Sequence, residues 1–226
     1  MLLAVDTSGP HCTVALADRD SGELITSSSE ELGRGHAERL MAMIGEVIGE
    51  ASAGYADLTA IGCTIGPGSF TGLRVGMAAA KGLALAAGIP CIGVTVFDAM
   101  RADVAEEPVA ITLDAKRGEI WLQWFGDGPG EPMALPPGHA AQDIPDGITR
   151  LVGSGASIVA DAAQQIGRTD LTVVEGNHHV TPHGLAAACL AAPEQQDPIR
   201  PLYLRAPDAK PQADVALAGI VKAGAA

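Results

Sequence analysis

Residues 60–96 read AIGCTIGPGSFTGLRVGMAAAKGLALAAGIPCIGVTV and carry the pattern that decides the fold. The apolar run at the start predicts a buried strand, and the glycine-rich stretch 66–72 predicts a turn. Residues 73–87 have the length and composition of a helix, which Gly88 ends. A second apolar run follows at 91–96. Strand, helix and strand in this order predict two parallel strands and an α/β protein.

Shorter patterns precede this unit. Residues 2–5, 12–17 and 23–28 alternate with turn-forming residues, which predicts an antiparallel meander. Residues 36–51 carry apolar side chains at steps of three and four, which is typical of an amphipathic helix. We therefore expect an N-terminal lobe over residues 1–104.

The second half repeats the first in outline. A strand pattern over 109–113 ends at Asp114, much as the first strand ends at Asp6, and both run into a polar turn and another strand. This echo predicts an internal duplication, with a C-terminal lobe over 105–226 whose last helix packs back on the N-terminal lobe. The remaining expected elements are strands at 119–125, 151–155 and 172–174, a loop at 127–145, and helices at 158–166, 182–191 and 212–226.

The composition excludes several classes of protein. Of the 226 residues 47% are hydrophobic, so the chain is neither disordered nor dependent on disulfides. The net charge of -13 comes without a basic block, so unaided nucleic-acid binding is not expected. The four cysteines lack zinc-site spacing and fit a reducing compartment. Since neither a signal peptide nor a membrane span is recognisable, we expect a soluble cytoplasmic protein.

The glycine-rich segment allows two interpretations. Glycines between a strand and a helix can bring backbone N–H groups to an anion at the helix N-terminus, although the lysine spacing of a P-loop is absent. Alternatively, the glycines serve packing. Gly72, Gly76, Ala80 and Ala84 fall four apart on one helix face and allow another backbone to approach closely.

Two polar turns are candidate ligand sites. Asp6, Thr7 and Ser8 end the first strand with a carboxylate and two hydroxyls, which are candidate nucleotide or phosphate contacts or the parts of a tight turn. Lys116 and Arg117 stand at the tip of the matching turn in the second half, where they hold an anion or are simply solvated.

We expect no metal site and no catalytic residue. His36 begins a predicted helix, but the residue four positions on is Leu40, so the second histidine of a helical zinc site is missing. His179 and His183 are separated by a predicted helix start. Ser69 lacks the Gly-x-Ser-x-Gly spacing of a hydrolase nucleophile.

Two helices indicate a partner surface. Helices 36–51 and 71–87 are apolar over more than the single face that a sheet covers, so the other side serves a partner or internal packing. The partner-interface candidates are His36, Leu40, Met43, Val47, Leu73, Met77 and Lys81.

Five segments resemble the TsaB (YeaZ) family: AVDTSG at 4–9, RGHAERLM at 34–41, GPGSFTGLRVGMAAAKGL at 66–83, LDAKRGEIW at 113–121 and PLYLRAP at 201–207. The resemblance implies the fold of actin, sugar kinases and the Hsp70 ATPase. This fold has two similar lobes, each a mixed sheet flanked by helices, and the C-terminal lobe is expected to be reduced.

The resemblance also implies a function. The family takes part in the transfer of a threonylcarbamoyl group to the adenosine beside the anticodon of tRNAs that read codons starting with A. The chain would be a noncatalytic scaffold that dimerises with the transferase TsaD through helices 36–51 and 71–87. The ATPase TsaE would join this complex, tRNA would be reached only through it, and the chain alone would form a homodimer. No tightly bound cofactor is implied, and ATP or ADP at the partner interface stays open.

An alternative is an autonomous ATP-dependent small-molecule kinase of the same fold. In that case Asp6, Thr7 and the turn 153–155 would hold phosphates.

Overall fold

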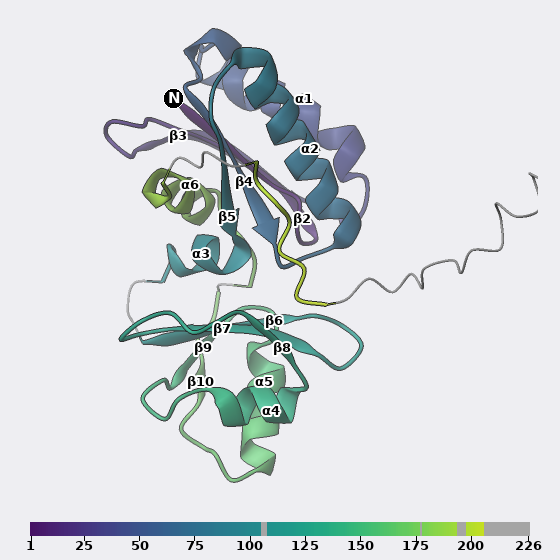
Figure 1. Cartoon of the computed structure of the whole chain (residues 1–226), viewed down its shortest axis with the longest axis vertical. Coiled ribbons are helices and arrows are strands. Elements are labelled where there is room, and N and C mark those ends of the chain that lie inside the picture. The colour runs from purple at the N-terminus through teal and green to yellow at the C-terminus, as the bar shows by residue number, and fades with distance from the viewer. Residues whose placement is uncertain (105–107, 177, 194–197, 206–226) are drawn as a thin grey trace, which may run out of the picture.

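Two lobes stacked along the long axis make up the protein (Figure 1). The computed structural model describes residues 1–104, 108–176, 178–193 and 198–205. We call residues 1–104 the N-lobe and residues 108–176 the C-lobe.

A five-stranded mixed sheet forms the centre of the N-lobe, in the order β3-β2-β1-β4-β5. Strand β1 pairs antiparallel with β2 and parallel with β4, and β4 pairs parallel with β5. The predicted meander and the predicted strand-helix-strand unit are both confirmed. The strands are β1 (Leu2–Asp6), β2 (His11–Ala17), β3 (Leu24–Glu31), β4 (Ala60–Gly66) and β5 (Cys91–Thr95).

Helices cover both faces of this sheet. The two long helices α1 (His36–Glu50) and α2 (Phe70–Ala87) lie on one face, where they pack on alternate residues of β1 such as Leu3. The short helix α3 (Val96–Arg101) and helix α6 (Pro182–Ala191) lie on the opposite face and pack on Leu2. A single turn of 3-10 helix, η1 (Tyr55–Asp57), precedes β4. Every residue of β1 is buried because both faces are covered.

The C-lobe repeats the strand arrangement. Its sheet has the order β10-β9-β6-β7-β8, and β6 pairs antiparallel with β7 and parallel with β9, as β1 does with β2 and β4. The predicted duplication is therefore present. The elements are β6 (Val109–Asp114), β7 (Ile120–Phe125), β8 (Met133–Leu135), α4 (Pro137–Asp143), β9 (Arg150–Val152), α5 (Ala156–Gln165) and β10 (Thr172–Val173).

Parts of the second half differ from the sequence-based expectation. Residues 127–145, expected as a loop, contain β8 and α4, because Pro137 occupies the first turn of a helix, where proline is tolerated. Helix α6 follows the C-lobe in sequence but packs on the N-lobe sheet, where Cys189 lies so close to Gly62 that a side chain there would overlap it. The expected helix 212–226 lies outside the described residues.

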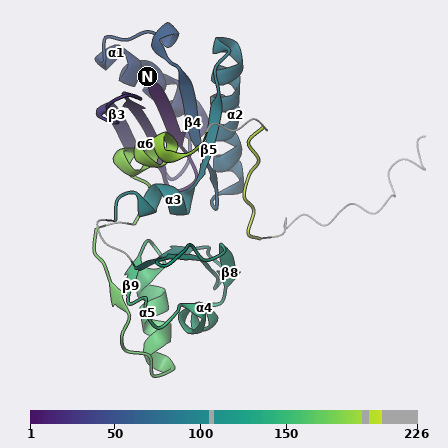
Figure 2. The ribbon, with the colours of Figure 1, turned by 60° about the vertical axis from the view of Figure 1, so that its left-hand side comes forward.

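In both views α3 lies between the two sheets (Figures 1 and 2). Throughout the described ranges, no helix combines the length and the apolar character needed to cross a membrane.

Candidate docking face and interlobe cleft

The glycines at the start of α2 serve close packing. A Cβ on Gly68 would lie 2.6 Å from the Ser8 carbonyl oxygen, and one on Gly76 would lie 2.5 Å from the Thr7 hydroxyl oxygen. A Cβ on Gly72 would overlap the Thr7 carbonyl oxygen. Of the two interpretations left open by the sequence, the packing one is thus confirmed: the backbone of α2 rests directly on the turn after β1.

The turn after β1 uses its polar groups internally. The Thr7 hydroxyl donates to the Gly72 carbonyl oxygen at 2.7 Å, and Thr7 is only 1% exposed. Asp6 Oδ1 accepts hydrogen bonds from the Ser8 backbone N–H at 3.0 Å and from the Thr64 hydroxyl at 2.5 Å. Burial raises the pKa of Asp6, although the hydrogen bonds from Ser8 and Thr64 oppose this. The three residues thus build a tight turn.

A cavity of about 1370 Å³ separates the lobes. Asp6 and Ser8 line it from the N-lobe, whereas Thr7 does not. The turn after β6, including Lys116 and Arg117, lines it from the C-lobe. Of the three candidate phosphate contacts, only two therefore face this cleft.

Histidines gather on the N-lobe side of the cleft. The rings of His11 and His179 stack with centroids 3.8 Å apart and planes 6° from parallel. His36 Nε2 lies 3.2 Å from the His11 carbonyl oxygen, which places the His36 ring at the cleft. Burial, and then the neighbouring His11, lower the pKa of His179. In the described part of the chain, no group of three or more His, Cys, Asp or Glu can hold a metal ion.

The turn after β6 mirrors the turn after β1. Asp114 Oδ1 accepts the Lys116 backbone N–H at 2.8 Å, and Asp114 Oδ2 pairs with Lys116 Nζ at 2.7 Å. The hydrogen bond from Lys116 lowers the pKa of Asp114. The Lys116 ammonium is therefore partly neutralised within its own turn.

Five of the seven expected interface side chains lie in the core of the chain itself. The five are at most 5% exposed and pack between the long helices and the sheet, so their role in this structure is in the chain's own core. Periodicity of large apolar residues marks the side of a helix that faces its own core, which is why the expectation selected them. These five are Leu40, Met43, Val47, Leu73 and Met77. Lys81 is exposed, and His36 lies at the cleft.

The outward side of α1 and α2 carries small and apolar residues instead. Leu85 is 85% exposed and Met41 is 48% exposed. Gly45, Gly49 and Gly82 are exposed inside helices, and no atom of the described residues lies within 4 Å of the place that a Cβ would take. Glycine inside a helix costs about 1 kcal/mol relative to alanine, and no contact within the described ranges requires it at these three positions. We call this surface the docking face: Met41, Ala42, Gly45 and Gly49 of α1 with Ala78, Gly82 and Leu85 of α2.

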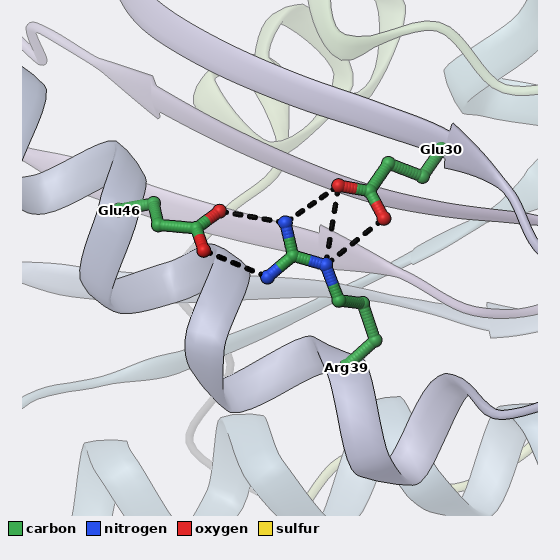
Figure 3. Close-up of polar contacts among 3 residues, drawn as sticks. All are labelled: Glu30, Arg39 and Glu46. Atoms are coloured by element: carbon green, nitrogen blue, oxygen red, sulfur yellow. Dashed lines mark hydrogen bonds and ion pairs between the residues drawn. The ribbon is translucent and has the colours of Figure 1, made fainter.

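Arg39 fixes α1 on the sheet beside this face (Figure 3). Its guanidinium donates to Glu30 on β3 at 2.6 Å and to Glu46, two turns further along α1, at 2.7 Å. Hydrogen bonds from Arg39 lower the pKa of both carboxyl groups. The guanidinium therefore links the start of α1 both to β3 and to the second half of α1.

The comparisons with known proteins agree with this architecture. The family model "TsaD: tRNA N6-adenosine threonylcarbamoyltransferase" matches residues 24–222. The chain belongs to the TsaD family and, within it, to the TsaB (YeaZ) group.

Three similar proteins show how far the likeness extends along the chain. Protein Rv3421c of Mycobacterium tuberculosis is 36% identical over 94% of this chain and 95% of its own length. The tRNA threonylcarbamoyladenosine biosynthesis protein TsaB of Escherichia coli is 33% identical over 57% of each chain. The solved structure of YeaZ from Pseudomonas aeruginosa has a TM-score of 0.70 at 28% identity, covering 90% of this chain and 99% of that one. The expected α/β fold of two similar lobes, each a mixed sheet flanked by helices, is confirmed.

Proposed function

We propose that the chain is an accessory subunit in the biosynthesis of tRNA threonylcarbamoyladenosine and that it docks on TsaD through the docking face. Membership of the TsaB group supports the pathway. The transfer itself, to adenosine beside the anticodon of tRNAs that read A-starting codons, is carried out by TsaD in this proposal.

The observation that carries the docking is the pair of adjacent helices with exposed small residues. Glycine and alanine let the backbone of a partner helix approach closely, and Leu85 and Met41 supply apolar area for burial. A second copy of the chain uses the same face when TsaD is absent, so homodimer and heterodimer exclude each other.

One observation supports a noncatalytic role over the autonomous kinase. The Thr7 hydroxyl, which that kinase would need for phosphates, is held by the Gly72 carbonyl of the chain itself. The net charge of -13 disfavours direct tRNA binding and so supports contact with tRNA through the complex. In this proposal TsaE joins the same complex. A nucleotide at the partner interface stays a prediction.

A charge placed on the docking face tests the proposal. Leu85→Glu puts a carboxylate where apolar contact is expected, so affinity for the TsaD of the same organism should fall at least tenfold, or about 1.4 kcal/mol. Ile158→Glu is the matched control, because Ile158 is an exposed apolar residue on α5, away from the docking face. Titration calorimetry measures the affinity, and circular dichroism confirms that both variants fold.

The proposed role in tRNA modification is tested with the wild-type chain and the same variants in a reconstituted reaction. Reactions contain TsaD, TsaE, threonylcarbamoyl-AMP and unmodified tRNA, with wild-type chain, a variant, or no chain. Modification should require the wild-type chain and fall with Leu85→Glu. Modification that proceeds equally without the chain would overturn the proposed function, and unchanged binding of Leu85→Glu would overturn the docking face. Phosphate transfer from ATP to a small molecule by the chain alone would favour the kinase.

A further inference from the structure

The last described segment, residues 198–205, crosses from the N-lobe toward the C-lobe beside α2 (Figures 1 and 2). We call it the strap. Its first half is anchored in the N-lobe: Ile199 is 4% exposed, and a Cβ on Gly93 would lie 3.0 Å from it. The Leu202 backbone N–H donates to the Ile65 carbonyl oxygen at 2.7 Å. The strap therefore starts from a fixed position on the N-lobe.

The end of the strap is tied to the C-lobe. Arg205 Nε donates to Glu119 Oε2 at 2.7 Å. Arg205 Nη2 donates to the carbonyl oxygens of Ala115 at 3.3 Å and Lys116 at 3.2 Å, and it also contacts Glu119. These groups belong to the hairpin 115–119, of which residues 115–117 line the interlobe cavity. One guanidinium thus joins the strap to the part of the C-lobe that faces the cleft.

The middle of the strap contacts α2. The rings of Tyr203 and Phe70 have centroids 5.5 Å apart, and the Arg74 guanidinium lies 3.8 Å from the centre of the Phe70 ring. Arg74 Nε donates to the Tyr203 hydroxyl at 3.4 Å. Phe70 is 48% exposed and Tyr203 39% exposed, so the cluster is open to a partner. Arg74 lies one helical turn from Ala78 of the docking face.

We propose that the strap couples the docking face to the position of the hairpin 115–119. This inference rests on the proposed function, because the occupant of the face is TsaD. A partner on α2 buries the cluster of Phe70, Arg74 and Tyr203, and removal of water strengthens its hydrogen bond and ring contacts. Tyr203 and Arg205 are two positions apart in the chain, a reach of about 7 Å, so fixing Tyr203 restricts Arg205 and the hairpin bound to it.

The free chain tests the tie between strap and hairpin. Arg205→Ala removes the guanidinium, so amide hydrogen exchange over 115–119 should become about tenfold faster. Arg200→Ala is the matched control, because Arg200 is an exposed arginine of the same strap and should leave this exchange unchanged. Arg205→Lys keeps the positive charge but lacks the planar guanidinium. Its exchange rate over 115–119 should fall between those of the two alanine variants. Equal exchange in Arg205→Ala and Arg200→Ala would overturn the proposal.

The complex tests the coupling. Binding of TsaD should slow exchange over 115–119 at least threefold in the wild-type chain and in Arg200→Ala, but not in Arg205→Ala, which should still bind. Slowing of the same size in Arg205→Ala would show direct coverage by the partner and overturn the coupling. If TsaD fails to bind the wild-type chain, the proposed function and the coupling both fail. The free-chain comparison then still decides whether Arg205 holds the hairpin.

Discussion

The two lobes share one strand order and differ in how much helix they carry. In the N-lobe, α1 and α2 have 15 and 18 residues, whereas the corresponding α4 and α5 of the C-lobe have 7 and 10. The short helices of the C-lobe cover its own sheet. The long helices of the N-lobe cover their sheet and still present a second, outward surface. The N-lobe therefore carries the longer helix layer, whose outward surface is the proposed docking face, and the C-lobe carries the shorter one.

The equivalent turns of the two lobes differ in burial. Asp6 and Asp114 each accept the backbone N–H two residues on, so their geometry is the same. Burial raises the pKa of Asp6, while Lys116 lowers that of the more exposed Asp114. The same turn thus responds to pH in opposite directions because its surroundings differ.

The largest effect should come from the packing of helix on turn. Gly72→Ala forces a Cβ against the Thr7 carbonyl and should lower the free energy of unfolding by about 3 kcal/mol or more. Gly155→Ala, at the residue that precedes α5 in the C-lobe, places a Cβ 3.0 Å from the Leu113 backbone and should lower it by about 1 kcal/mol. Urea denaturation measures both values.

A control on the same helix separates packing from helix propensity. Gly82→Ala meets nothing within 4 Å and should raise the free energy of unfolding by up to about 1 kcal/mol. Similar losses at Gly72 and Gly82 would contradict close packing as the reason for the glycines.

An intermediate loss of unfolding free energy is expected from Arg168 of the C-lobe, and a smaller one from Arg39 of the N-lobe. Arg168 has a side chain only 13% exposed and donates to the carbonyls of Ala141 at 2.9 Å and Ile148 at 3.3 Å, among others. Arg168→Ala leaves these carbonyls without partners and should cost about 2 to 3 kcal/mol of unfolding free energy. Arg39→Ala should cost clearly less than Arg168→Ala, because water can replace the guanidinium at the carboxylates of Glu30 and Glu46.

The salt dependence of unfolding tests this difference between Arg39 and Arg168. Denaturation in high sodium chloride should shrink the Arg39→Ala loss and leave most of the Arg168→Ala loss. A larger loss for Arg39 than for Arg168 would reverse the assignment.

The smallest expected effect is on the pH dependence of stability, to which Asp6 and Asp114 should contribute with opposite signs. The raised pKa of Asp6 gives stability that is present below the usual value of 3.8 and lost as pH rises through the folded-state pKa. The lowered pKa of Asp114 gives stability that is present above 3.8 and lost as pH falls through the folded-state pKa. Relative to Asp6→Asn, the wild-type chain should lose stability as pH rises. Relative to Asp114→Asn, the wild-type chain should gain stability as pH rises.

Urea midpoints of the three proteins between about pH 3 and pH 7 give both slopes. Slopes of the same sign would show that burial does not distinguish the two turns.

Much of the fold was predictable because local patterns agree with it. The strand-helix-strand unit, the meander and the duplicated aspartate turns all follow from periodicity and turn residues close in sequence. Strand β8 and helix α4 were missed, since their glycines and prolines are those of a loop.

The proposed docking face was harder to predict, because the sequence pattern that marks it is small residues rather than large apolar ones. Large apolar residues such as Met43 and Met77 point to the core, whereas the docking face consists mainly of glycine and alanine. Exposed glycines inside helices, with no internal contact to explain them, are the pattern that would have located it. The strap segment was visible as PLYLRAP, but its two anchors are distant in sequence and appear only in three dimensions.

The placement of α6 has a consequence for synthesis of the chain. One face of the N-lobe sheet is completed by residues such as Leu185 and Cys189, which the ribosome adds about a hundred residues after β5. Until then, apolar positions of the first strands stay uncovered on the side that α6 closes. The first lobe therefore cannot finish folding as an independent early unit, and its maturation waits for nearly the whole chain.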